Sequence, residues 1–181
     1  MTEDNLDDVS RWIEEAIEGI GWDMASPQGE GTLADAVIDT VIDGIQARSL
    51  VKRGADALGG EGEWKDNEPL YRKRKQAAYG EHNPNFRTTQ MLSRESLKGD
   101  PAIGHDETTW PYGTGRPAAD GKTKHDRTIT DVEKARYAEQ GQSEHRIRRP
   151  FFAVTEEDAD DALLVVEDAV AQHFERKANG A

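Results

Sequence analysis

The C-terminal segment, TEEDADDALLVVEDAVAQHFERK, carries the strongest helix pattern in the chain. Thr155 has the side chain of a helix N-cap, and the three acidic residues that follow it complement the positive end of a helix dipole. Apolar residues then recur at helical spacing, at Leu163, Val166, Val170 and Phe174. The segment predicts a long amphipathic helix that covers another layer of structure.

A second helix pattern lies in the N-terminal half, from Thr32 to about residue 53. Thr32 and Asp35 have the spacing of a capping box, in which each side chain bonds the other residue's backbone N–H. Leu33, Val37 and Val41 mark the apolar stripe of this helix. Its length and pattern predict a buried helix that packs against the C-terminal one.

Only short elements fit between these two helices. LYRKRKQAAY predicts a basic helix that starts at about Pro69, and RTTQMLSRESL predicts an amphipathic turn leading into a strand. Residues 128–130 are β-like and precede a short helix that closes at Gly141. Residues 99–127 contain five glycines and three prolines, which is typical of a functional loop or hairpin that orders against a neighbour.

These patterns predict an α+β fold in which a small antiparallel sheet is packed by the long helix of the N-terminal half and by the C-terminal helix. Residues 4–20 predict a further acidic helix, and SPQGEG at 26–31 reads as a linker. We therefore expect residues 1–30 to form a helical arm. Residues 31–181 would form a single domain, with a loop insertion at about 99–127.

The net charge of −13 is unevenly distributed. Residues 1–45 hold 12 acidic side chains and one basic, residues 155–181 hold eight acidic and two basic, and the middle of the chain is basic to neutral. A negative surface repels nucleic acid and membranes, but in an oligomer it can line a channel through which DNA slides without sticking. Solvated acidic helices are the plainer explanation of the same charge.

The sequence offers no catalytic motif. The chain has no cysteine, which excludes disulfides, thiolate catalysis and cysteine-ligated metal sites. The histidines lack the pairing of a zinc helix, GTGRP lacks the spacing of a phosphate loop, and no serine lies in a nucleophile elbow. No stretch is apolar enough to cross a bilayer, and the first residues lack the pattern of a signal peptide. We expect no enzyme, cofactor, metal or membrane partner, and assembly in a reducing cytoplasm.

YRKRKQ, residues 71–76, is the one basic run. Arg72, Lys73, Arg74 and Lys75 could grip nucleic-acid phosphates as an electrostatic patch. One aromatic and four bases fall short of a recognised nucleic-acid module, however. A helical face that pairs with the acidic helices of another subunit explains the run as well, so both hypotheses stay open.

An arginine-rich segment, RIRRPFFAV at residues 146–154, precedes the C-terminal helix, and we call it the arginine corner. The residue before a proline is biased to an extended conformation, so Arg149 is expected to be extended. Pro150 cannot donate a ladder hydrogen bond, which favours an edge strand or an extended corner. The arginines either face a neighbouring subunit or are solvated at a strand-to-helix junction.

The order of these signals resembles that of the phage virion morphogenesis, or tail completion, proteins. The stretches that carry the resemblance are GEGEW (60–64), LYRKRK (70–75), TTQMLSRESL (88–97), KARYAEQG (134–141) and RIRRPFFAVTEED (146–158). The matching residues are Trp64, Thr89, Leu92, Ser96, Tyr137, Ala138, Gly141, Ile147, Arg149, Pro150 and Phe151. The chain departs from the family pattern at Gln90, where the motif has glycine, and at Arg148, which interrupts the usual proline–arginine spacing. It also lacks the histidine that follows the tyrosine–alanine pair in the family motif.

The resemblance implies a subunit of the phage neck or head–tail junction, similar to a tail completion or tail terminator protein. Such a subunit forms a homo-oligomeric ring, hexameric by family analogy, that caps the tail and joins it to the head. Its partners would be neighbouring neck, connector or tail tube proteins, and DNA would pass through the lumen without specific binding. The protein would be part of the virion after assembly in the host cytoplasm. A head-side neck or connector protein is the close alternative, and a cytoplasmic nucleic-acid-associated regulator is the alternative of another class.

In such a ring the arginine corner would meet the acidic ends of the adjacent copy. Pro150 would fix the chain direction, and either Phe151 or Phe152 would anchor the corner to the core while the other faces the partner. Together with the basic helix, the expected interface residues are Arg146, Arg148, Arg149, Phe151, Phe152, Arg72 and Arg74. The expected structural residues are Trp64, Thr89, Leu92, Tyr137, Gly141, Pro150 and Thr155.

Overall fold

The computed structural model describes residues 17–50, 68–79, 92–122, 128–140, 152 and 154–180. The helices are α2 (Leu33–Leu50), α3 (Pro69–Tyr79), α4 (Arg94–Lys98), α5 (Asp131–Gln140) and α6 (Glu156–Ala178). The strands are β1 (Ala102–Ile103), β2 (Thr108–Thr109), β3 (Pro117–Lys122) and β4 (Thr128–Thr130). The fold is α+β and mostly helical, which confirms the predicted class.

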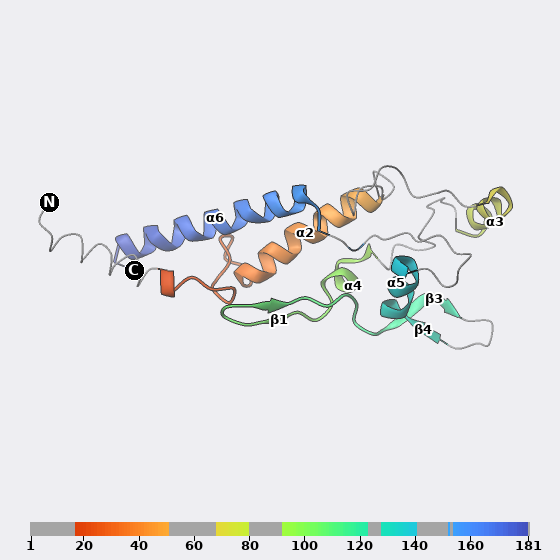
Figure 1. Cartoon of the computed structure of the whole chain (residues 1–181), viewed down its shortest axis with the longest axis horizontal. Coiled ribbons are helices and arrows are strands. Elements are labelled where there is room, and N and C mark those ends of the chain that lie inside the picture. Colours follow the sequence, from red (N-terminus) through yellow and green to blue (C-terminus); the bar gives the residue numbers. More distant parts are fainter. Residues whose placement is uncertain are drawn as a thin grey trace, which may run out of the picture.

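The two long helices lie side by side and run in opposite directions (Figure 1). The β1–β2 and β3–β4 pairs are antiparallel and form two separate two-stranded sheets. The β1–β2 hairpin occupies part of the glycine- and proline-rich segment, where a loop or hairpin was expected. In Figure 1 this hairpin runs beneath the helix pair, α5 lies against the β3–β4 sheet, and α3 lies at one end of an elongated molecule.

The core forms around the buried stripe of α2. Ile38, Val41, Ile42 and Ile45 pack against residues from two other segments, namely Leu92, Leu97 and Ala135. The predicted stripe is confirmed at Leu33 and Val41, which are buried, whereas Val37 is only half-buried. The capping box is also confirmed, because the Thr32 hydroxyl accepts from the Asp35 N–H and the Asp35 carboxylate accepts from the Thr32 N–H, both at 3.1 Å.

The inner face of α6 differs from the predicted one. Its buried residues are Asp158 and Ala169, with Ala162 packed against the core cluster, whereas Leu163 is 53% exposed. The prediction that Leu163 lies in the buried stripe is therefore wrong. The small alanine side chains let α6 approach α2 closely. Because this face of α6 is turned toward α2, the Asp158 carboxylate also lies against α2. The N-cap prediction is confirmed, because Thr155 and Asp158 form a capping box.

The SPQGEG segment is a closed turn that folds back onto the start of α2. The buried Ser26 hydroxyl donates to the Glu30 carbonyl at 2.7 Å and accepts from the Glu30 N–H at 3.1 Å. An isolated bridge pairs Ala25 with Thr32. Ile17 and Glu18 are helical, and the rest of the predicted N-terminal helix lies outside the described residues. The division between arm and domain at residue 30 stays a prediction.

The segment before this turn is attached to the β1–β2 hairpin through His105. The Trp22 N–H donates to the His105 carbonyl at 2.8 Å, and His105 Nδ1 lies 2.8 Å from an Asp23 carboxylate oxygen. The hydrogen bond and charge of Asp23 raise the pKa of His105 above its usual value, with a smaller contribution from Asp106.

We predict that this attachment weakens as the pH rises. The protonated imidazole is favoured in the folded state, so its contribution is fully present below about pH 6.5 and is lost as the pH rises through the elevated pKa of His105. Hydrogen exchange at the Trp22 amide, measured between about pH 5 and about pH 8, checks this after correction for intrinsic exchange. His105→Gln should remove the pH dependence, and an unchanged profile in that variant would contradict the assignment.

Candidate functional site

A buried ion pair fixes α6 on α2. The Arg48 guanidinium donates to the Asp158 carboxylate, and the exposed fractions of the two side chains are only 7% and 2%. Burial raises the pKa of Asp158, but hydrogen bonds from Arg48 and Thr155 outweigh it and hold that pKa below its usual value. The Arg48 guanidinium also donates to the Thr155 hydroxyl at 3.2 Å. Arg48 of α2 therefore fixes the first turn of α6. This contact also determines which side of α6 faces away from α2.

Gly44 of α2 makes room for this ion pair. A Cβ atom at Gly44 would lie 1.9 Å from Oδ1 of Asp158, far inside van der Waals contact. Glycine within a helix normally costs about 1 kcal/mol relative to alanine. The close approach of α6 is the reason that glycine stands here.

We predict that Gly44→Ala destabilises the protein by about 1–3 kcal/mol, because overpacking outweighs the gain in helix propensity. Urea unfolding of the variant measures this. The matched comparison is Gly44→Ala in an Asp158→Ala background, where the clash is absent and the same change should be neutral or stabilising. A stabilised single variant would contradict the close approach of the two helices.

A second buried carboxylate, Asp131, holds the loop between the hairpin and β3. Its side chain is fully buried and accepts from the backbone N–H groups of Thr114 (3.0 Å), Gly115 (3.0 Å) and Val132 (2.9 Å). The Ser96 hydroxyl donates to it at 3.4 Å. The backbone of the GTGRP segment is thus wrapped around one carboxylate.

Arg116 joins this cluster to α4. Its guanidinium donates to the hydroxyls of Ser93 (2.9 Å) and Ser96 (2.8 Å) and to the Glu95 carboxylate. A serine, an arginine and a buried aspartate are thus close together, but each is held by structural hydrogen bonds. The serines and Asp131 serve here as anchors of a loop.

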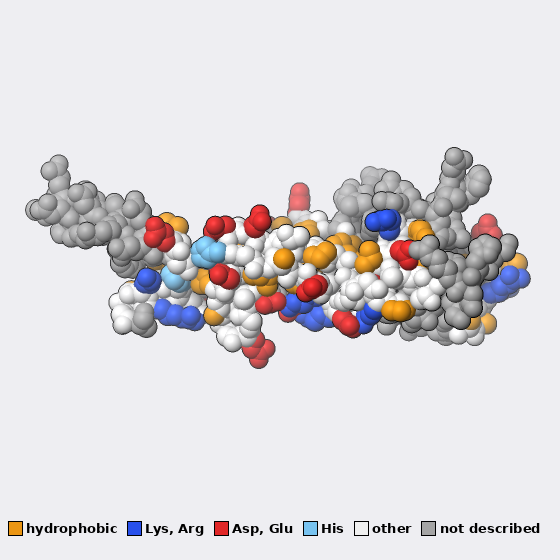
Figure 2. Space-filling model, turned by 90° about the horizontal axis from the view of Figure 1, so that it is seen from below, with side chains coloured by type: hydrophobic (Ala, Val, Ile, Leu, Met, Phe, Trp, Pro, Cys, Tyr) orange, Lys and Arg blue, Asp and Glu red, His pale blue; other side chains and the backbone are white. Residues whose placement is uncertain are grey.

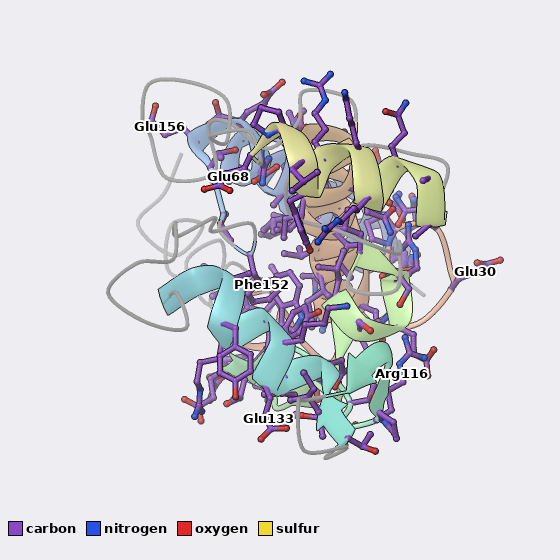
Figure 3. The ribbon with its side chains drawn as sticks, turned by 90° about the vertical axis from the view of Figure 1, so that its right-hand side faces the viewer. Glu30, Glu68, Arg116, Glu133, Phe152 and Glu156 are labelled. Atoms are coloured by element: carbon purple, nitrogen blue, oxygen red, sulfur yellow. The ribbon has the colours of Figure 1, made fainter. Side chains whose placement is uncertain are left out.

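Phe152 packs on the aromatic residues of the central segment. Its ring lies edge-on to Trp110 at 5.3 Å and to Tyr112 at 5.2 Å between centroids. Figure 3 shows Phe152 in the interior beside α5, whereas the labelled Glu30 and Glu133 point outward. Phe152 therefore contacts the core, whereas Phe151 lies outside the described residues. Its expected role at a subunit interface stays a prediction.

The structure places five more of the predicted residues. Leu92 is buried in the core cluster and Thr155 caps α6, while Arg72 and Arg74 are exposed on α3. Tyr137 is half-buried on α5. The remaining predicted residues lie outside the described part of the chain: Arg146, Arg148, Arg149, Phe151, Trp64, Thr89, Gly141 and Pro150.

The short basic helix was predicted from about Pro69 and is confirmed as α3. Each of its described side chains is exposed, including Leu70 at 62% and Tyr71 at 42%. Figure 2 shows lysine and arginine side chains next to hydrophobic ones at the end of the molecule where α3 lies. We call the exposed side of α3 the basic helix face, defined by Leu70, Lys73 and Arg74.

The outer face of α6 has the opposite charge. Leu163 and Leu164 are 53% and 63% exposed, and acidic residues precede and follow them along the helix. Asp160 and Glu167 stand one turn before and one turn after, and both are exposed. We call this strip, made of Asp160, Leu163, Leu164 and Glu167, the acidic leucine face.

The acidic residues of α2 are already paired within the chain. Lys98 of α4 lies 2.8 Å from Asp35 and 3.5 Å from Asp39, and Arg94 lies 2.9 Å from Asp39. The hydrogen bond with Lys98 is the largest cause of the lowered pKa of Asp35. A basic helix therefore already packs on an acidic helix inside this fold, whereas the acidic leucine face has no such cover among the described residues.

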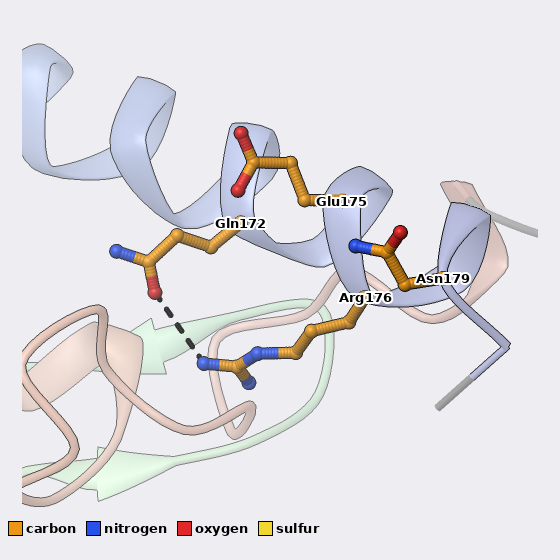
Figure 4. Close-up of a pocket in the computed structure, with 4 residues that line it drawn as sticks. All are labelled: Gln172, Glu175, Arg176 and Asn179. Atoms are coloured by element: carbon orange, nitrogen blue, oxygen red, sulfur yellow. Dashed lines mark hydrogen bonds between the residues drawn. The ribbon is translucent and has the colours of Figure 1, made fainter.

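The surface hollow at the C-terminal end of α6 does not resemble a ligand site. Figure 4 shows that its lining residues are Gln172, Glu175, Arg176 and Asn179, of which Arg176 donates to Gln172 at 3.4 Å. These are surface side chains without a buried polar group aimed at a ligand. The described residues contain no group of three potential metal ligands. No helix among them has the length and apolar character that a membrane span requires.

No protein-family model matches the chain, and the searches of curated proteins and of solved structures gave no significant match. The resemblance to tail completion proteins therefore rests on the motifs alone and stays a prediction.

Sequence reasoning missed the two buried carboxylates. Arg48 continues the α2 stripe of Val41 and Ile45, so its position on a buried face indicates that an acidic partner is required. Asp158 lies one turn before Ala162 and stands on the inner stripe of α6 in the same way. Asp131 follows Thr130 at the start of α5, a position where carboxylates bind free backbone N–H groups.

Proposed function

We propose that the protein is a structural subunit of the phage neck or head–tail junction, similar to a tail completion or tail terminator protein. It would act by binding alone, as one copy of a homo-oligomeric ring that caps the tail and joins it to the head. Neighbouring neck, connector or tail tube proteins would bind its two sides. DNA would pass through the lumen without specific contacts.

One observation carries this proposal beyond the resemblance: the described surface bears two exposed helix faces of opposite charge. The basic helix face and the acidic leucine face each combine exposed apolar side chains with charges of one sign. Exposed apolar patches on soluble proteins mark binding surfaces. Two different complementary patches on one chain favour a heterologous contact, which closes into a ring when the rotation between copies allows it.

Sedimentation velocity of the purified full-length protein, with and without duplex DNA, tests the proposal. We expect one oligomeric species whose sedimentation does not change when DNA is added. The alternative of a nucleic-acid-associated regulator is favoured by the exposed basic residues of α3. It predicts a monomer or small oligomer that binds DNA and releases it as salt increases, because phosphate contacts release counterions. That result would overturn the ring proposal.

A further inference from the structure

We propose that the basic helix face of one copy docks on the acidic leucine face of the next copy. The inference rests on the proposed ring and names the two surfaces that meet in it. The contact would join Leu70, Lys73 and Arg74 of one copy to Asp160, Leu163, Leu164 and Glu167 of its neighbour.

The first argument is that α3 is a short helix whose described side chains are exposed. It has 11 residues, and helices shorter than about 12–15 residues are marginal in water unless tertiary packing supports them. All of its described side chains are exposed, and Lys73 and Arg74 make no ion pair with another described residue. A neighbouring surface that covers Leu70 would add tertiary support to this short helix.

The second argument is the match between the two faces in pattern and length. Asp160, Leu164 and Glu167 follow one side of α6 at helical spacing, just as Leu70, Lys73 and Arg74 follow one side of α3. The acidic strip spans about 10 Å along its helix and α3 about 16 Å, at about 1.5 Å per residue. Two helices of these lengths can lie across each other with leucine against leucine and opposite charges around them.

The third argument distinguishes a second copy from a nucleic acid. A phosphate backbone would match the charges of α3 but would offer no apolar surface to Leu70. It would also leave the acidic leucine face uncovered, because that face repels phosphate. A second copy covers both faces with one contact. The same chemistry already operates inside the fold, where the bases of α4 pair with the acidic side of α2.

The places of the two faces make this contact head-to-tail. In Figure 1, α3 lies at one end of the molecule, well away from α6, so the two faces of one copy do not meet each other. A contact between unlike patches repeats from copy to copy and generates either a ring or a filament. The ring is the form that the proposed function requires.

Charge reversal tests the contact on the full-length protein by sedimentation velocity at low salt. The variant Lys73→Glu/Arg74→Glu and the variant Asp160→Lys/Glu167→Lys should each shift the protein from the ring to the monomer at the same concentration. The variant with all four changes restores opposite charges across the contact and should recover the ring. The matched control, Asp100→Lys/Glu107→Lys, reverses two exposed acids outside both faces and should assemble as the unchanged protein does.

Each outcome separates this inference from the proposed function. If the unchanged protein forms a ring and both reversal variants still do, the docking inference is overturned and the proposed function stands. Loss of assembly in both reversal variants without recovery in the combined variant also contradicts the pairing, provided that circular dichroism shows native helix content. An unchanged protein that stays monomeric, or that binds DNA through Lys73 and Arg74 instead, overturns both proposals.

Discussion

Asp158→Ala is expected to lower the free energy of unfolding by about 3–5 kcal/mol, because it leaves the Arg48 charge buried without its carboxylate partner. Asp158 is 2% exposed and also completes the capping box at the start of α6. Small domains are stable by only about 5–15 kcal/mol, so the variant should be partly unfolded at moderate urea concentrations. Urea unfolding, followed by far-ultraviolet circular dichroism as a measure of helix content, gives the loss of stability.

Two matched variants separate the ion pair from the loss of an acidic side chain. Asp160→Ala removes an exposed acid from the same helix and should change stability by about 0.5 kcal/mol or less. Arg48→Met/Asp158→Leu replaces both charges with apolar groups and should recover much of the loss, since no unpaired charge remains. A cost for Asp158→Ala no larger than that for Asp160→Ala would show that the pair does not hold the helices together.

The same pair gives stability a dependence on acid pH. The folded-state pKa of Asp158 is lowered, so its contribution is fully present above its unfolded value of about 3.9 and is lost as the pH falls through the lower folded value. The Asp158→Ala variant should lack this part of the acid transition.

Asp131→Ala is expected to destabilise the protein by about 3–5 kcal/mol as well. The change removes a fully buried acceptor and leaves the part-buried N–H groups of Thr114, Gly115 and Val132 without their partner, at a cost of about 1 kcal/mol or more for each lost hydrogen bond to a charged group. Besides global stability, amide exchange at Thr114 and Gly115 should accelerate, because this loop is held by the carboxylate. Exchange that stays slow at both amides would contradict the anchoring role.

Glu133→Ala is the matched control for this prediction. Glu133 is in the same first turn of α5 and accepts from the Thr130 N–H at 3.1 Å, with Thr130 as its capping partner. Losing this cap should cost about 1 kcal/mol and should leave exchange at Thr114 unchanged. The difference between the two variants isolates the contribution of the buried carboxylate.

Local signals predicted most of the helices. Thr32 with Asp35 and Thr155 with the acids after it are side chains that satisfy backbone groups within one turn, so their effect is visible in a few consecutive residues. The β-like stretch 128–130 and the helix after it were found in the same way, from turn residues and short patterns. The sequence therefore predicts best those helices and strands whose ends are fixed by side chains within a few consecutive residues.

Long-range polar contacts could not be placed from the sequence. Arg48 and Asp158 are 110 residues apart, and the sequence pattern of one helix does not indicate which charged residue of the other helix it contacts. The inner face of α6 was misassigned at Leu163 because periodicity gives a large aliphatic residue more weight than an alanine. In the structure alanines face α2 instead, because the close approach of the two helices around Gly44 and Asp158 requires small side chains. Leu163 and Leu164 are therefore exposed on α6 and do not belong to the core.

Electron microscopy of lysates from a phage that carries a nonsense codon in this gene tests the central claim most directly. If the protein completes the tail, the lysate should contain filled heads beside detached tails, with tails of abnormal length among them. Leaking or empty heads beside normal tails would move the protein to the head side of the neck. Intact, infectious virions would contradict the proposed role in the head–tail junction.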